Sequence, residues 1–120
     1  MATVKAAAKT ERRQADVDLR AQVLLSVQRA LLGCITADMR LISVEWSPFR
    51  IHLHVYVDGV DGITREGAYE DFAAVAVRQI VADFPEPYPV GPQVSCTFHR
   101  CDAPQKPDFD GEVVYARREP

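Results

Sequence analysis

Hydrophobic and polar positions alternate most regularly over residues 50–57. The apolar positions are Ile51, Leu53, Val55 and Val57, and the polar ones are His52, His54, Tyr56 and, just beyond, Asp58. A period of two residues indicates a β-strand with one face in a core. Residues 40–46 alternate in the same way, and Ser47-Pro48-Phe49 is a turn sequence. The two stretches are therefore predicted to form an antiparallel hairpin.

Two other stretches have the spacing of amphipathic helices. The first is predicted to begin at Asp16 as N-cap and to end at Gly33, with Leu25 and Leu32 widening its buried face. Its apolar stripe is Val23, Leu24, Val27, Ala30, Leu31 and Cys34. The second is predicted to begin near Thr64 and to end before Pro85. Its stripe is Tyr69, Phe72, Ala73, Ala76, Val77, Ile80 and Phe84.

Two further strands are predicted near residues 94–99 and 111–118, separated by a loop with Pro104 and Pro107. The order α-β-β-α-β-β predicts an α+β fold with two layers: a four-stranded antiparallel sheet and two helices on one of its faces. The other sheet face is then expected to be open to solvent. Its polar residues would be Ser43, Glu45, His52, His54, Tyr56, Ser95, Thr97 and His99.

The length of 120 residues favours one domain, which we place at residues 16–120 after a flexible N-terminal extension of residues 1–15. The first residues lack the apolar centre of a secretory signal. No apolar run reaches the roughly 18 residues that a membrane span needs. We therefore expect a cytoplasmic protein that does not enter the membrane.

Charge is unevenly distributed along the chain. Residues 1–30 hold six basic and three acidic residues, whereas residues 31–120 hold eight basic and fourteen acidic ones. A nucleic-acid-binding domain should show a basic stripe, so the acidic body disfavours a nucleic acid as partner. It suits a basic partner, because complementary fields accelerate encounter.

His52 and His54 would lie on one face of a strand, about 7 Å apart. With Glu45 or His99 as third ligand they could bind zinc, and as a general acid–base pair they could serve an RNA-cleaving site. Such spacing is also common in exposed strands, so neither site is predicted. The odd cysteine count, Cys34, Cys96 and Cys101, favours free thiols. The sequence contains no cofactor-binding fingerprint, so we expect no cofactor.

Four stretches together resemble the immunity proteins of bacterial polymorphic toxin and contact-dependent growth inhibition systems. They are LLGCITADMRLISVEW, IHLHVYVDG, the helix end VADFPEP and the last strand VVYARRE. The resemblance covers about residues 22–119. The chain departs from it in the N-terminal extension and in the non-acidic turn Ser47-Pro48-Phe49. These motifs are structural and transfer no catalytic residue.

The resemblance implies an inhibitor rather than an enzyme. Such a protein binds a cognate toxin C-terminal domain, often a nuclease. From the charge of the body we expect this domain to be basic, and we expect the free chain to be a monomer or weak homodimer. We expect Tyr56 as an anchor, and steering by the acidic zone of residues 58–71. The candidate interface residues are His52, His54, Tyr56, Asp58, Asp61, Glu66, Glu70 and Asp71. The alternatives are a small hydrolase or nuclease using His52, His54 and His99, or a structural subunit.

Overall fold

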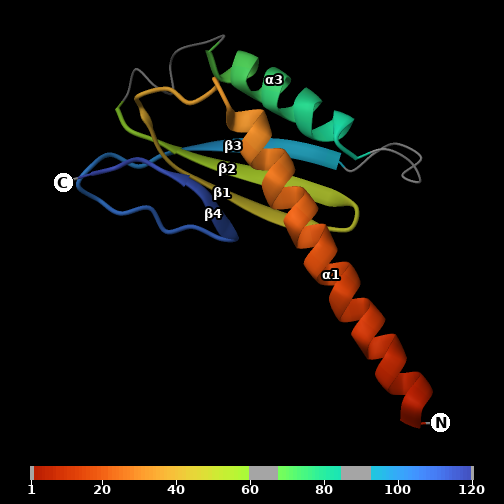
Figure 1. Cartoon of the computed structure of the whole chain (residues 1–120). Helices are drawn as coiled ribbons and strands as arrows, with labels where there is room; N and C mark the ends of the chain where they lie inside the picture. The colour runs from red at the N-terminus through yellow and green to blue at the C-terminus, as the bar shows by residue number, and fades with distance from the viewer. Residues whose placement is uncertain (1, 60–67, 85–92, 120) are drawn as a thin grey trace.

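A computed structural model describes residues 2–59, 68–84 and 93–119 of the chain. Two helices and four strands lie within these residues (Figure 1), so the predicted α+β class is confirmed. In chain order they are α1 (Ala2–Leu31), β1 (Met39–Ser47), β2 (Arg50–Val57), α3 (Ala68–Ala82), β3 (Gln93–Arg100) and β4 (Glu112–Ala116). The alternation of residues 50–57 thus predicted β2 with the bounds that the structure gives it.

The sheet is mixed, and its strand order is β3-β2-β1-β4. β1 pairs in antiparallel fashion with both β2 and β4, but β2 and β3 are parallel. The prediction of an antiparallel sheet is therefore wrong. The reason is α3, which lies between β2 and β3 in the chain. This crossover brings the chain back to the end of the sheet where β2 begins, so that β3 can run parallel to β2.

One hydrophobic cluster joins both helices to the sheet. α1 contributes Val23 and Val27, α3 contributes Phe72, Ala76 and Ile80, and the strands contribute Ile42, Val44, Ile51, Leu53, Val55 and Val57. Every apolar position of the β2 alternation is therefore buried. Trp46 packs at the margin of this core. The two-layer arrangement with both helices on one face stays a prediction.

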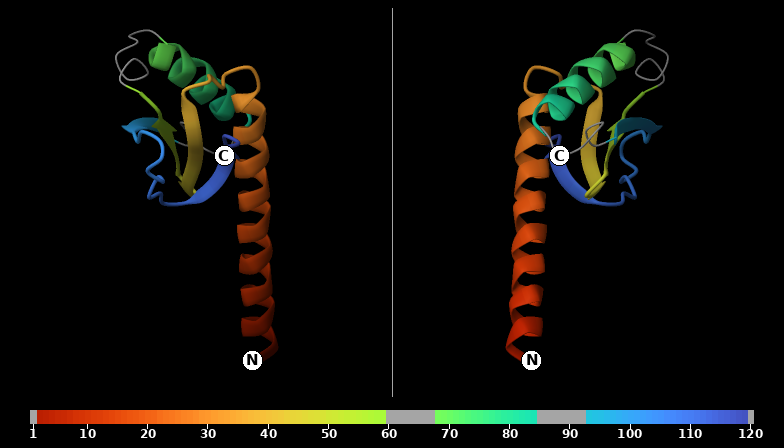
Figure 2. Two further views of the ribbon diagram at one scale, coloured as in Figure 1. Left: turned by 90° about the vertical axis from the view of Figure 1, so that its left-hand side faces the viewer. Right: turned by 90° about the vertical axis from the view of Figure 1, so that its right-hand side faces the viewer.

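α1 is longer than the sequence pattern predicted. It begins at Ala2, so the assignment of Asp16 as N-cap is wrong. Figures 1 and 2 show its N-terminal half extending away from the other elements. Leu25 and Leu32 do not widen the buried face, because their side chains are 59% and 78% exposed. The flexibility of residues 1–15 stays a prediction.

The connection from β3 to β4 must cross the sheet, since these strands form its two edges. We call the sheet surface that carries His52, His54 and Tyr56 the polar face. Residues 101–111 lie over one end of it, where the Tyr56 hydroxyl donates to the Asp108 carbonyl at 3.2 Å. Ser43 has no exposed surface there. The expectation of an open face therefore holds only for the other end, beside the β1–β2 turn.

Candidate functional site

Side chains of three adjacent strands form rows across the polar face. Glu45 on β1 is opposite His52 on β2, and Ser95 on β3 continues this row. The next row joins Ser43, His54 and Thr97 in the same way. The strand register therefore brings together the polar residues that the sequence predicted for one face.

His52 is held by two hydroxyl groups of β3. Its Nδ1 bonds to Ser95 Oγ, and its Nε2 lies 2.9 Å from Thr97 Oγ1. Burial lowers the pKa of His52 below its ordinary value, and the neighbouring His54 lowers it further. The neutral imidazole is thus favoured, with both ring nitrogens engaged.

His54 links Glu45 to His99. Its Nε2 lies 2.8 Å from Glu45 Oε2, and its Nδ1 lies 2.9 Å from His99 Nε2. The His99 ring also stacks on Tyr56, with 4.8 Å between ring centroids. Burial, and then the neighbouring His54, lower the pKa of His99. His54 and His99 are therefore hydrogen-bonded and stacked, and the His52 ring contacts His54 edge-on, so the three form one cluster.

This cluster does not have the arrangement of a metal site. Within the described part of the chain, no three His, Cys, Asp or Glu side chains are grouped so that they could hold a metal ion. Both ring nitrogens of His52 and of His54 already have hydrogen-bonding neighbours. A metal ion would have to displace these contacts, because imidazole binds a metal through a free nitrogen lone pair.

Tyr56 lies mostly inside the protein. Its side chain is sandwiched between the sheet and residues 101–111, and the residue is 7% exposed. Burial raises the pKa of its phenol, and the nearby carboxylates of Asp110 and Asp108 raise it further. The role of Tyr56 as an interface anchor stays a prediction. In this structure its hydroxyl is hydrogen-bonded to the backbone of residues 101–111.

Asp58 also has internal partners. Its carboxylate accepts hydrogen bonds from the Arg117 guanidinium and from the Ala103 amide, each at 3.2 Å. Arg117 also contacts Glu119, which in turn holds the buried Arg40 through two bonds of 2.7 and 2.9 Å. Asp58 thus belongs to a network that fixes the C-terminal residues, and its predicted interface role stays untested.

Sequence reasoning did not find this network. Arg40 was assigned only to the start of a strand, yet its guanidinium also donates to the carbonyls of Cys101 and Gln105, each at 2.6 Å. Arg40 and Glu119 are 79 positions apart in the chain. No local pattern connects residues so distant, although the charged end of VVYARRE was a signal that the terminus has ionic partners.

The predicted acidic zone is only partly described. Asp61 and Glu66, like the proposed N-cap Thr64, lie outside the described residues. Glu70 and Asp71 are exposed in the first turn of α3. Carboxylates there are favoured by the positive end of the helix dipole, which is a structural reason for their presence.

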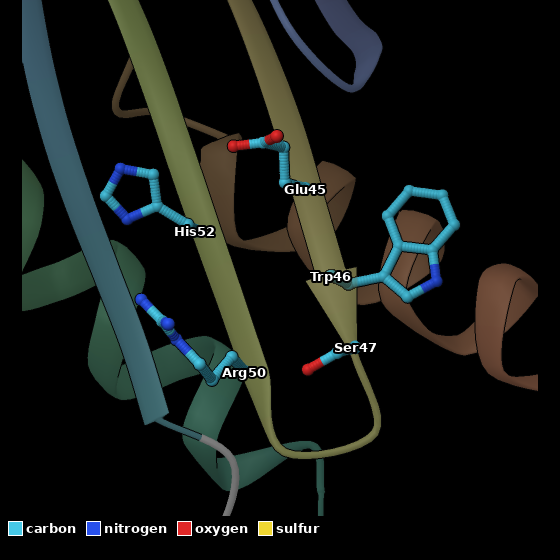
Figure 3. Close-up of a pocket in the computed structure, with 5 residues that line it drawn as sticks. All are labelled: Glu45, Trp46, Ser47, Arg50 and His52. Atoms are coloured by element: carbon cyan, nitrogen blue, oxygen red, sulfur yellow. The ribbon is translucent and has the colours of Figure 1, made fainter.

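A shallow pocket of about 310 Å³ lies at the hairpin end of the polar face. Glu45, Trp46, Ser47, Arg50 and His52 line it. Figure 3 shows that Trp46 leaves β1 in the direction opposite to Glu45 and Ser47. Phe49, in the turn that joins β1 to β2, is 71% exposed.

The three cysteines are free thiols. Cys96 is turned toward the core, and burial raises its pKa to about 12. A thiol with so high a pKa is a poor nucleophile, because the reactive species is the thiolate. The surroundings of Cys96 are therefore not those of a catalytic cysteine. Cys34 donates to the Ala30 carbonyl at 3.4 Å.

Comparison with protein families shows which family this chain is similar to. The profile of the MafI2 immunity protein family matches residues 20–119. The chain belongs to the MafI2 immunity protein family. The resemblance to polymorphic toxin immunity proteins, drawn from four sequence stretches, is thereby confirmed. None of the curated proteins compared with the chain matches it.

The MafI2 match begins inside α1 and includes all four strands and α3. It therefore covers the histidine cluster, the network around Arg40 and the hairpin end. The first part of α1, which extends from the body, lies outside it. Neither helix of the described chain combines the length and the apolar character needed to cross a bilayer.

Proposed function

We propose that this chain binds a cognate toxin domain and neutralises it as a one-to-one inhibitor in the cytoplasm. The observation that carries the proposal is the match to the MafI2 immunity protein family over residues 20–119. An inhibitor of this kind needs a complementary surface and no chemistry of its own. The engagement of the polar-face histidines with one another and with Glu45 is consistent with that role.

We further propose that the toxin is a nuclease with a basic substrate cleft. The support is electrostatic, because residues 31–120 carry fourteen acidic and eight basic residues. Complementary fields steer partners together and raise the association rate. Glu70 and Asp71 are exposed acidic residues suited to this steering, and Asp61 and Glu66 of the same stretch are candidates with them.

The histidine cluster favours a second candidate, a small hydrolase or nuclease. His54 Nδ1 and His99 Nε2 are 2.9 Å apart, and the His52 and His54 rings are 4.5 Å apart between centroids. Groups this close could transfer protons. A general base must also reach a substrate proton, however, and the nitrogens of His52 and His54 point to neighbouring side chains.

Co-expression with the toxin domain encoded beside this chain tests the proposal. We expect cell growth to be restored and the two proteins to be purified together at equal molar amounts. Failure of both would contradict the inhibitor function. Replacing His99, which is not among the candidate interface residues, with Ala separates the two candidates: an inhibitor should still protect cells, whereas an enzyme that depends on the three histidines should lose its activity.

A further inference from the structure

The polar face has a covered end and an open end. Residues 101–111 lie over the first, where Tyr56 is buried beneath them. At the second, beside the turn that joins β1 to β2, Ser47, Arg50 and Ser95 are exposed. A partner that meets the sheet surface without displacing residues 101–111 can therefore reach only the hairpin end. We define the hairpin end as residues 45–52 together with Ser95.

Arg50 differs from three other arginines of the sheet and its flanks, which are held by carboxylates. Its guanidinium has no hydrogen bond or ion pair within the described chain, and the residue is exposed. Arg40, Arg100 and Arg117 are all bound to carboxylates. The Glu45 carboxylate, which shares the pocket with Arg50, is bound by His54 at 2.8 Å. Arg50 thus presents a guanidinium without a hydrogen-bonded carboxylate at a pocket that it shares with Glu45.

Phe49 adds an exposed aromatic residue one position before Arg50 in the chain. It is 71% exposed and lies in the two-residue connection between Ser47 and Arg50, which pair across the hairpin. The hairpin holds the turn in place, and the Phe49 carbonyl accepts a hydrogen bond from the Gln93 amide at 3.0 Å. An exposed aromatic residue on a fixed backbone, next to an arginine, has the composition of an interface hot spot.

We propose that the hairpin end is the surface that docks the toxin domain, with Phe49 as the apolar anchor and Arg50 as a carboxylate-binding group. The complementary surface is an apolar depression of the toxin next to an Asp or Glu side chain. Arginine binds a carboxylate through two parallel hydrogen bonds, which gives both strength and orientation. The proposal rests on the proposed inhibitor function and replaces Tyr56 with Phe49 as the anchor.

This short-range contact is compatible with an acidic inhibitor. The acidic residues of the body act over longer distances and set the rate of encounter, whereas Phe49 and Arg50 act after contact and set the rate of dissociation. A second copy of the chain suits the hairpin end less well. A tip-to-tip contact of two hairpins buries little of the roughly 800 Å² per partner that a stable interface needs.

Binding of the purified toxin domain to the full chain tests this surface. We expect Phe49→Ala and Arg50→Glu each to weaken binding by at least about tenfold, mainly through faster dissociation. The matched controls are Phe109→Ala, at another partly exposed phenylalanine, and Arg78→Glu, at an exposed arginine of α3. Both controls should bind within about twofold of the wild-type chain. Unchanged thermal unfolding of the variants shows that they are folded.

The possible outcomes are distinct. Wild-type affinity in both Phe49→Ala and Arg50→Glu would overturn the hairpin end as the docking surface while leaving the inhibitor function intact. Absence of binding by the wild-type chain would overturn the inhibitor function and the surface with it. A dimer of the free chain in light scattering that Arg50→Glu dissociates would assign the hairpin end to a second copy, and would also overturn the proposal.

Discussion

Individual polar side chains of the sheet are mostly engaged by other side chains of the same molecule. His52 is bound by Ser95 and Thr97, and His54 by Glu45 and His99. The spacing of His52 and His54 predicted that they share a face. The alternation also placed Ser95, Thr97 and His99 on that face, but which of them contacts which histidine depends on the parallel register of β2 with β3.

The histidine cluster predicts a stability that falls in mildly acidic solution. Burial, and then His54, lower the pKa of His52 and His99 below the ordinary value of 6.5. The unfolded chain therefore binds protons more readily than the folded chain. The free energy of unfolding should then decrease as the pH falls below about 6.5 and level off once both histidines are protonated in the folded state.

Thermal unfolding between about pH 8 and pH 5 measures this effect, and a His52→Gln, His99→Gln double variant should show a flatter dependence. Titration of Glu119 does not contribute to the change in stability over this pH range. Its pKa is lowered to about 2, chiefly by hydrogen bonds from Arg40, so its stabilisation is lost only as the pH falls from its usual 4.5 toward 2. An identical pH dependence in the wild type and the double variant would contradict the account of the cluster.

Among the elements, β4 and the connection that leads into it are fixed by a close backbone approach. Gly111 has a φ of +88°, and a Cβ atom there would lie 2.3 Å from the Val44 carbonyl oxygen. The chain turns at this point from the polar face into its pairing with β1. Glycine permits both the positive φ and the contact, which no other residue does without displacing β1.

Gly111→Ala is therefore expected to destabilise the protein by roughly 2–4 kcal/mol, since strain and a clash act together. Gly59→Ala is the matched control. Gly59 has a φ of +87° but open space where a Cβ would be, so the cost should be only about 1 kcal/mol. Chemical denaturation of both variants tests the comparison. Equal losses would show that the approach of residue 111 to Val44 has no energetic effect.

Sequence patterns predicted the elements better than their arrangement. The alternation in β2 and the apolar stripe of α3 depend on neighbouring residues, and both were found. The start of α1 at Ala2 was not predicted, because the residues before Asp16 have no apolar stripe. The helix between β2 and β3 favours a parallel pair of these strands. The antiparallel prediction followed the short connections elsewhere in the chain and gave this helix too little weight. The partial cover of the polar face by residues 101–111 follows only from the complete strand order.

The molecule as a whole combines an acidic body with an extended helix. Its maximum extents are 60 × 31 × 18 Å, and the N-terminal half of α1 accounts for the long dimension (Figure 2). The MafI2 match omits the first 19 residues, so we place toxin binding on the body. The charge that steers the partner should then act from the body and not from α1.

Replacing Glu70 and Asp71 together with Lys should slow association with the toxin domain by roughly five- to tenfold at low salt, and by less at physiological salt. Asp16→Lys with Asp18→Lys changes the net charge equally, but on the exposed part of α1. That control should have the smaller effect on the association rate. Stopped-flow binding measures both. Equal rates for the two double variants would show that steering does not depend on the first turn of α3.

The central claim is that this MafI2 family member neutralises its toxin by binding it, and an activity titration tests this most directly. Increasing amounts of the chain are added to a fixed amount of toxin domain, at a concentration well above the dissociation constant, and the remaining toxin activity is measured. We predict a linear loss of activity that ends at one equivalent of the chain. Complete loss at a small fraction of an equivalent would indicate a catalyst that modifies the toxin or its product, and full activity at excess chain would contradict neutralisation by binding.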